Sequence, residues 1–297
     1  MPLRRLAAAT LLALSFGAAG AQSAVAADKP DDRPAIPVEE VPYVRTPQAV
    51  VDRMLELAEV GPEDFLVDLG SGDGRIVITA AQQRGARGFG VELDPSLVDA
   101  SNAAAHRAGV AERARFYVRD LFDTDISAAS VLTMYLLPAV NLALRPRLLK
   151  QLRPGTRVVS HDWNMGEWQP DASAVVTGLD KAVMPQRSST LYLWIIPAKV
   201  AGAWRVEIEG AAQPMQIEFA QRFQEISGVV TRARGRTLLQ SGHVRGAEIR
   251  FALIDENQRP SAPLHFFGRV YGDRMEGTIV QGATGSGQRW HAVRAQD

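Results

Sequence analysis

The chain has 297 residues, of which 46% are hydrophobic and 22% are charged, and its 33 basic and 33 acidic side chains give a formal net charge of zero. This composition is that of an ordinary globular protein, and the length suffices for one large domain or two smaller ones. The absence of cysteine excludes disulfides and thiolate metal sites, and without a block of like charges no nucleic-acid partner is expected.

Residues 1–27 have the three parts of a secretory signal peptide. Arg4 and Arg5 precede an uncharged apolar stretch over 6–19, and small residues beyond it offer two candidate cleavage sites. A retained membrane anchor is the alternative, because no charged residue follows until Asp28, but the second half is too polar for a good span. We expect export to the periplasm and no stable membrane span after cleavage.

The next segments are a linker and a helix. Residues 28–42 are rich in proline and acidic side chains, which predicts an extended linker with no fold of its own. The run "TPQAVVDRMLELAEVG" then predicts a helix, with Thr46 as its N-cap and Pro47 in its first turn. Its apolar residues recur on one face, as in a helix that covers a sheet.

Strand-like and helix-like runs alternate from residue 65 onward. Helices are predicted over 75–84, 95–108 and 139–152. The strand-like runs are "FLVDLG", "GFGVEL", "ARFYVRD", "SVLTMYLL" and "GTRVVSHDW". This alternation predicts an α/β fold with a mostly parallel sheet covered on both faces. Residues 173–197 break the rhythm and predict an antiparallel pair that closes one sheet edge.

The pattern changes after about residue 198 to short alternating runs separated by turns. It predicts an antiparallel meander of six or more strands, curled or closed into a small barrel. The domains are therefore expected over 43–198 and 199–297. The aromatic residues expected in the barrel core are Trp204, Phe251, Phe266, Phe267 and Trp290.

The run "LVDLGSGDGRIV", residues 66–77, places Gly70, Gly72 and Gly74 at every second position between a strand and a helix. Such a turn brings backbone N–H groups close to a ligand, and the helix N-terminus favours a negative group. A dinucleotide fingerprint would read G-x-G-x-x-G, so the spacing argues against a nicotinamide-dependent oxidoreductase. A tight turn without a ligand is the structural alternative.

Acidic residues mark the ends of the first three predicted strands. Glu92 lies 24 residues after Asp68, where its carboxylate can accept both hydroxyls of a ribose. Asp120 ends the third strand, where it can receive the amino group of an adenine. Each acid alone would more often be a solvated strand end, but ligands bind at the edge where the carboxyl ends of parallel strands meet.

These motifs resemble those of the class I, S-adenosylmethionine (SAM)-dependent methyltransferases over residues 43–197. The runs "VDLGSGDGRIVITAA" and "GFGVELDP" are most similar to a small lysine-methyltransferase branch, associated with mitochondrial ATP synthase and nucleotide-carrier subunits. The resemblance implies a Rossmann-like, mostly parallel seven-stranded sheet, to which the C-terminal β domain is an addition. It also implies methyl transfer from SAM to an amine, with a protein lysine as the first candidate and a small molecule as the other.

The resemblance further implies which residues bind the cofactor. The methionine part would contact Tyr43, Thr46, Asp68, Gly70, Ser71, Gly72 and Gly74. The ribose and adenine would contact Glu92, Leu93, Asp120 and Leu121.

The loops after the fourth and fifth strands would face the methyl group and supply the candidate catalytic residues. Tyr135 and Asn141 follow the fourth strand, although a core tyrosine and a helix-capping asparagine explain them equally well. His161 and Asp162 follow the fifth and suggest a base. Because adjacent residues of a strand point to opposite faces, only one of these two is expected to reach the pocket. No metal site is expected, since the other histidines lack ligand spacing.

Export also motivates a second functional hypothesis. SAM is made in the cytosol, so an exported chain could instead be a SAM- or nucleoside-binding protein without methyl transfer.

Overall fold

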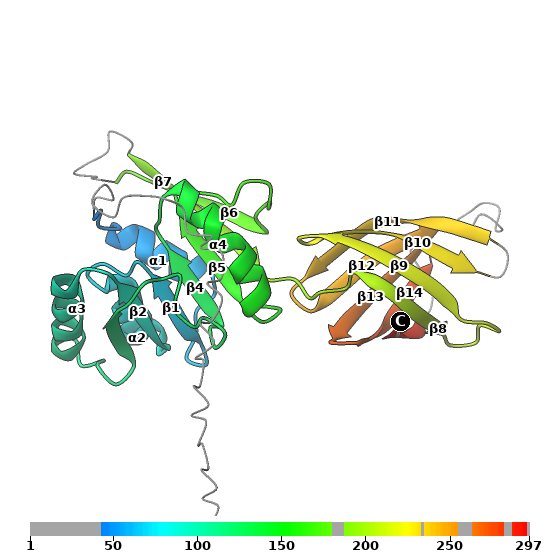
Figure 1. Cartoon of the computed structure of the whole chain (residues 1–297), viewed down its shortest axis with the longest axis horizontal. Helices are drawn as coiled ribbons and strands as arrows, with labels where there is room; N and C mark the ends of the chain where they lie inside the picture. The colour runs from blue at the N-terminus through cyan, green and yellow to red at the C-terminus, as the bar shows by residue number, and fades with distance from the viewer. Residues whose placement is uncertain (1–42, 180–186, 233–234, 255–262, 282–286, 296–297) are drawn as a thin grey trace, which may run out of the picture. The chain divides into compact units, whose positions relative to one another are not determined.

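The computed structural model describes the chain from residue 43 onward, with short gaps (Figure 1), and the described ranges are 43–179, 187–232, 235–254, 263–281 and 287–295. The predicted signal peptide over 1–27 and the predicted linker over 28–42 lie outside these ranges. No helix within the described ranges is long and apolar enough to cross a membrane.

The first folded part is a seven-stranded sheet with the order β3-β2-β1-β4-β5-β7-β6. Its strands are β1 (Phe65–Leu69), β2 (Arg87–Glu92), β3 (Ala114–Val118), β4 (Val131–Met134), β5 (Arg157–His161), β6 (Ala172–Thr177) and β7 (Ser188–Ile195). Strands β1 to β5 are parallel, while β7 runs antiparallel to both β5 and β6. The predicted Rossmann-like sheet and its antiparallel edge pair are confirmed.

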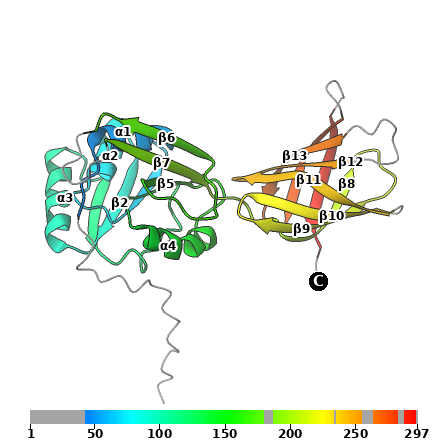
Figure 2. The same cartoon turned by 90° about the horizontal axis from the view of Figure 1, so that it is seen from above.

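Helices cover both faces of this sheet (Figure 2). They are α1 (Gln48–Leu57), α2 (Arg75–Arg84), α3 (Pro95–Arg107) and α4 (Pro138–Gln151). The first three share one apolar core with side chains such as Leu66, whereas α4 packs Leu144 and Leu148 with Val67 against the opposite face. This division follows from the period of two in β1, which sends neighbouring apolar side chains to opposite faces.

The start of α1 differs from the prediction. Pro47, not Thr46, is the N-cap residue, and no side chain caps this helix. The hydroxyl of Thr46 instead lies 3.4 Å from the Nδ1 atom of His161, a residue 115 positions further along the chain. A tertiary contact has therefore replaced the local cap.

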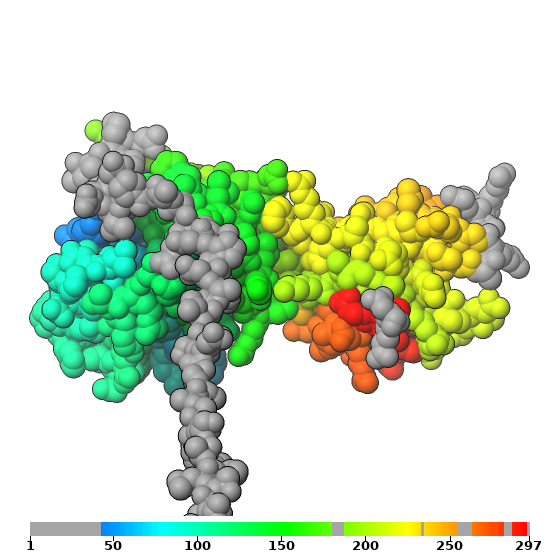
Figure 3. All heavy atoms as spheres, in the orientation of Figure 1, coloured from blue at the N-terminus to red at the C-terminus, as the bar shows by residue number. Residues whose placement is uncertain are grey.

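The second folded part is a closed antiparallel barrel of eight strands, β8 to β15, as the meander pattern predicted. The strands are β8 (Gly202–Ile208), β9 (Met215–Arg222), β10 (Glu225–Arg232), β11 (Gly235–Arg245), β12 (Glu248–Ile254), β13 (Pro263–Tyr271), β14 (Arg274–Gln281) and β15 (Gln288–Arg294). Side chains cover the barrel wall on the face shown in Figure 3. Closure leaves no free sheet edge, which removes a common route to aggregation.

Stacked aromatic rings fill the barrel. The rings of Phe251 and Phe266 lie 4.5 Å apart and nearly parallel, and Trp290 meets Phe266 edge-on at 5.6 Å. Four of the five aromatic residues predicted for this core are buried, but Phe267 is 48% exposed. Because Phe267 follows Phe266 directly on β13, strand alternation turns its side chain outward.

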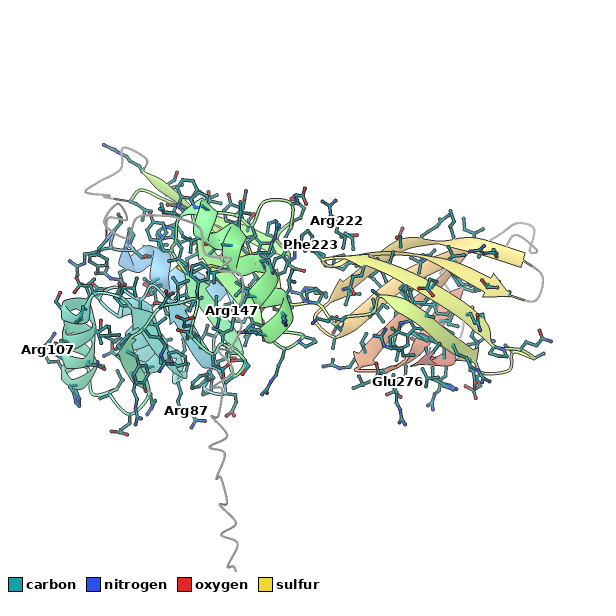
Figure 4. The ribbon with its side chains drawn as sticks, in the orientation of Figure 1. Arg87, Arg107, Arg147, Arg222, Phe223 and Glu276 are labelled. Atoms are coloured by element: carbon teal, nitrogen blue, oxygen red, sulfur yellow. The ribbon has the colours of Figure 1, made fainter. Side chains whose placement is uncertain are left out.

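Alternating charges form a row across the barrel wall and help to fix its register. Strand pairing places neighbouring members of the row side by side, in the order Arg245, Glu248, Arg269, Glu276, His291 and Glu207. Glu276 is labelled in Figure 4. Directly opposed pairs of unlike charge each contribute about 0.2–1 kcal/mol. A slip of one strand by one residue would break the pairs that this strand makes with both of its neighbours.

The packing of the barrel core predicts that two neighbouring phenylalanines contribute very differently to the free energy of unfolding. Phe266→Ala leaves a cavity among the packed rings and should lower the free energy of unfolding by about 3–5 kcal/mol. Phe267→Ala, the matched control, should lower it by about 1 kcal/mol or less. Urea unfolding followed by tryptophan fluorescence measures both, and equal losses would contradict the inward and outward assignment.

Candidate active site

The glycine turn that links β1 to α2 is folded back onto β2. The backbone N–H groups of Gly70 and Ser71 both donate to the carbonyl oxygen of Val91, at 3.0 and 2.9 Å. Gly74 is the N-cap of α2 and has a φ of +77°, and a Cβ atom there would lie 2.6 Å from the ring of Phe116. Glycine is therefore needed to pack this turn against Phe116 of β3.

Tyr43 lies directly over the middle glycine of the turn. A Cβ atom on Gly72, which has a φ of +52°, would lie only 2.4 Å from the Cε2 atom of Tyr43. The Nε atoms of Arg45 and Arg75 donate to the carboxylate of Asp73 at 3.2 and 2.8 Å. The segment before α1 thus closes over the glycine turn, where the sequence placed Tyr43.

Asp73 and Arg75 hold this segment electrostatically. Burial opposes the ionisation of Asp73, but hydrogen bonds and the positive charge of Arg75 outweigh it and lower its pKa. Burial raises the pKa of Tyr43, and the neighbouring Asp73 carboxylate adds to the rise. The Nη1 atom of Arg75 also donates to the carbonyl oxygen of Thr46 at 2.7 Å, which extends the network to the start of α1.

Asp68 is a buried carboxylate with one unsatisfied oxygen. Its Oδ1 atom accepts a 2.7 Å hydrogen bond from Thr133, while its Oδ2 atom and the hydroxyl of Ser71 have no hydrogen-bond partner among the described residues. Burial raises the pKa of Asp68 to about 7, helped by the charge of Glu92 and opposed by the Thr133 bond. Unsatisfied buried acceptors call for a donor, and the ammonium group of the methionine part of SAM is one.

Glu92 ends β2 with its carboxylate fixed by the backbone. Its Oε2 atom accepts from the N–H of Gly72 at 3.1 Å, and its Oε1 atom accepts from the N–H of Leu93 at 2.7 Å. A carboxylate has about four lone-pair positions, so both oxygens can still accept from a ribose. Leu93, 46% exposed, offers apolar surface beside it. This geometry of Glu92 suits a ribose, and the ribose contact itself stays a prediction.

The loop after β3 carries the predicted adenine residues and is held by an arginine from another element. Asp120 accepts a 2.7 Å hydrogen bond from the N–H of Phe122. Arg147, which projects from α4 (Figure 4), donates to the carbonyl oxygen of Leu121 at 2.8 Å and also to those of Phe122 and Thr124. The sequence does not indicate this role of Arg147, because the residues around an arginine within a helix do not show which loop it will contact.

The hydrogen-bond donors and acceptors along this sheet edge fit an adenosyl sulfonium such as SAM. Acidic oxygens lie near the end of β1, at the end of β2 and in the loop after β3, and each is already oriented by the chain. The site thus combines a bare backbone turn with acceptors for an ammonium group, a ribose and an adenine amine.

The loop after β4 places Tyr135 next to the glycine turn. Leu136 packs so closely on Gly70 that a Cβ atom there would lie 2.8 Å from its Cδ2 atom. The ring of Tyr135 lies 3.9 Å from that of His161, centroid to centroid. Burial raises the pKa of Tyr135, as do the charge of Asp162 and a hydrogen bond with its side chain. Tyr135 is thus part of a polar cluster and not a simple core residue.

Strand alternation predicts that only one of His161 and Asp162 reaches the pocket. The structure brings both side chains into one cluster, in which His161 is fully buried and the Asp162 side chain is 16% exposed, so the statement about the pocket stays a prediction. Asp162 has a φ of +62°, outside the strand conformation, so the alternation of side chains ends at His161. The Oδ2 atom of Asp162 therefore lies 3.3 Å from the Nε2 atom of His161. The hydroxyl of Ser189, which sequence analysis did not single out, lies 2.6 Å from the same nitrogen.

Asn141 connects two elements behind this cluster. Its Nδ2 atom donates to the Ser160 hydroxyl at 3.1 Å and to the Trp163 carbonyl oxygen at 3.2 Å. Leu137, not Asn141, is the N-cap of α4, so the helix-capping interpretation is wrong. Asn141 is fully buried and ties α4 to the turn after β5.

The raised pKa of Asp68 predicts how the affinity for S-adenosylhomocysteine (SAH), the demethylated product of SAM, depends on pH. Only ionised Asp68 attracts the ligand's ammonium group, and the carboxyl is largely protonated below its pKa of about 7. Affinity should therefore rise with pH, by at most about tenfold per pH unit, and level off above about pH 7. Calorimetric titrations between pH 5 and 8.5 measure the profile.

Two variants sharpen this test. Asp68→Asn should weaken binding at pH 8 and remove the rise, whereas Thr133→Val should move the rise to higher pH because it deletes the bond that lowers the Asp68 pKa. An unchanged profile in Asp68→Asn would show that another group causes it.

Known proteins with similar sequences identify the family of this chain. The sequence profile of the ANTKMT methyltransferase domain matches residues 68–172. A protein-lysine N-methyltransferase of Saccharolobus islandicus is 42% identical over 160 residues, which are 54% of this chain and 96% of that protein. The adenine nucleotide translocase lysine N-methyltransferase of mouse is 38% identical over 143 residues, 48% of this chain and 61% of that protein.

A solved structure also has a similar sequence. It is a crystal structure described as an RNA methyltransferase from Salinibacter ruber in complex with SAH. The two sequences are 54% identical, and the match covers 53% of this chain and 96% of the other, with a TM-score of 0.47.

The relative from Saccharolobus islandicus is matched over nearly its whole length, and the domain profile spans the sheet from the glycine turn to the start of β6. The chain therefore belongs to the ANTKMT family of class I methyltransferases, and it is a SAM-dependent methyltransferase with a C-terminal eight-stranded barrel.

Proposed function

We propose that this chain transfers a methyl group from SAM to the Nζ atom of a lysine in a protein. The supporting observation is the 42% identity that extends over 96% of a protein-lysine N-methyltransferase. The acidic and phenolic cluster beside the glycine turn agrees with a cationic acceptor, because it places Asp162 and Tyr135 at the same sheet edge as the cofactor residues.

Bound SAM supplies a methyl group on a positively charged sulfur, which a neutral amine can attack directly as the carbon–sulfur bond breaks. The chain's own task is to bind, orient and shield the two reactants. A lysine ammonium must lose one proton before it can attack, so the acceptor region has to admit the cation and then favour the neutral amine. The buried side chains around His161 provide such a weakly solvated environment.

Methyl transfer is tested with isotopically labelled SAM and a cell-envelope protein extract. We expect label in protein, located on lysine by mass spectrometry of the digested product. Glu92→Ala should bind SAH about tenfold to a hundredfold more weakly, because it loses hydrogen bonds to a charged group. Glu112→Ala, which removes an acid that is 93% exposed, is the matched control and should leave both transfer and affinity unchanged.

The outcomes separate the functional classes. Label in RNA from the same cells, but not in protein, would replace lysine with a nucleic-acid acceptor. SAH binding without transfer to any fraction would favour the SAM-binding protein that does not catalyse methylation.

We also propose that residues 1–27 direct export to the periplasm, with retention as a membrane anchor as the competing outcome. Two arginines, an uncharged apolar stretch and small residues in that order support this proposal. Fractionation of cells that express the full chain or a chain lacking residues 1–27 tests it. We expect the full chain in the periplasm with a shortened N-terminus and the truncated chain in the cytosol. An intact Met1 on cytosolic protein would refute export, and recovery in the membrane pellet would indicate an anchor.

A further inference from the structure

A buried polar cluster draws its members from four separate places in the sheet domain. His161 ends β5, Asp162 follows it, Ser189 belongs to β7, Tyr135 follows β4 and Thr46 precedes α1. His161, Ser189 and Thr46 are buried, whereas the Asp162 side chain is 16% exposed and Tyr135 is half-buried. The two members that reach the surface are thus a carboxylate and a phenol.

The cluster lies beside the cofactor residues. Strand β4 pairs with β1, and Leu136 packs on Gly70 of the glycine turn. Thr46 belongs to both regions, since its carbonyl oxygen accepts from Arg75 and its hydroxyl contacts His161. A group bound between Tyr135 and Asp162 would therefore lie close to the methionine end of the cofactor.

The backbone at Asp162 is held in a conformation that turns its carboxylate back into the cluster. A positive φ is costly for a non-glycine residue and persists where the surroundings enforce it. Here the Asp162 N–H donates to the Thr190 carbonyl oxygen at 2.7 Å, and the Thr190 N–H donates to Asp162 Oδ1 at 2.9 Å. This reciprocal pair with β7 directs Oδ2 toward His161, and the Asp162 carboxylate also hydrogen-bonds to Tyr135.

We propose that Asp162 and Tyr135 form the binding site for the acceptor's alkylammonium group and that His161 is a positioning residue beneath them. The proposal rests on the function proposed above and names the residues that receive its substrate. The carboxylate accepts a charge-assisted hydrogen bond from the cation, and the tyrosine ring offers its face. The tyrosine hydroxyl also hydrogen-bonds to the carboxylate and so orients it. Since the His161 ring lies against one side of that ring, tilted by 31° and 3.9 Å away between centroids, the alkylammonium group binds on the other side.

His161 acts through its neighbours because it is fully buried. Its Nε2 atom lies 2.6 Å from the Ser189 hydroxyl and 3.3 Å from Asp162 Oδ2, and its Nδ1 atom lies 3.4 Å from the Thr46 hydroxyl. With both ring nitrogens engaged, the imidazole plane is fixed, and it in turn fixes the Tyr135 ring and the Asp162 carboxylate.

Binding of n-butylammonium to the full chain saturated with SAH tests the subsite without requiring turnover. Ligand-observed NMR should detect binding of n-butylammonium but not of n-butanol, its uncharged analogue. Asp162→Asn should weaken binding of the cation at least tenfold, and Tyr135→Phe severalfold. Asp99→Asn and Tyr117→Phe alter exposed residues of the same types and should match the parent. The affinity for SAH should change less than twofold in all four variants.

Two substitutions of His161 distinguish positioning from a merely structural role. His161→Leu should lose cation binding as Asp162→Asn does, and His161→Gln, which can still hydrogen-bond to Ser189, should recover part of it. Both should keep the parental SAH affinity. Equal losses in the two variants, or a parallel loss of SAH affinity, would refute the positioning role.

The results also separate this inference from the proposed function. If the parent does not bind the cation, or if Asp162→Asn and Tyr135→Phe bind it as the parent does, the subsite is refuted even when protein lysine is methylated. If the cation binds as expected and no protein is methylated, the subsite stands and the lysine assignment fails.

Discussion

One carbonyl oxygen, that of Val91, sets the geometry on which the cofactor site depends. It accepts the N–H groups of both Gly70 and Ser71, so the chain leaving β1 must bend over the end of β2. The bend brings Gly72 within hydrogen-bonding distance of Glu92, the residue that follows Val91. It also buries Asp68 beneath the turn, where desolvation raises its pKa. The glycines at alternate positions are the feature of the sequence that permits this bend.

Much of the sheet domain could be predicted because its signals are local. Apolar runs followed by acids gave the parallel strands, and the helices over 75–84 and 95–108 were predicted to within a residue of their observed ends. The acids at 68, 92 and 120 were recognisable because parallel strands carry their carboxyl ends to one edge. The barrel followed from turn spacing, although eight strands and their closure required long-range pairing that no local pattern encodes.

The rest depends on tertiary contacts or on departures from regular backbone. The alternation of side chains along a strand wrongly placed Asp162 and His161 on opposite faces. Alternation holds only for strand dihedral angles, whereas Asp162 has a positive φ. Ser189 and Arg147 act through partners 28 and up to 26 residues away, and nothing in their neighbouring residues marks them. Phe267 was assigned to the core on its residue type, whereas the period of two along β13 decides its side.

Thr46 connects two parts of the site that have separate chemical roles. Its backbone oxygen is held by Arg75, which belongs to the glycine turn, while its hydroxyl contacts the imidazole below the phenol and the carboxylate. Because one residue makes both contacts, the segment over 43–46 couples the position of the glycine turn to that of the imidazole.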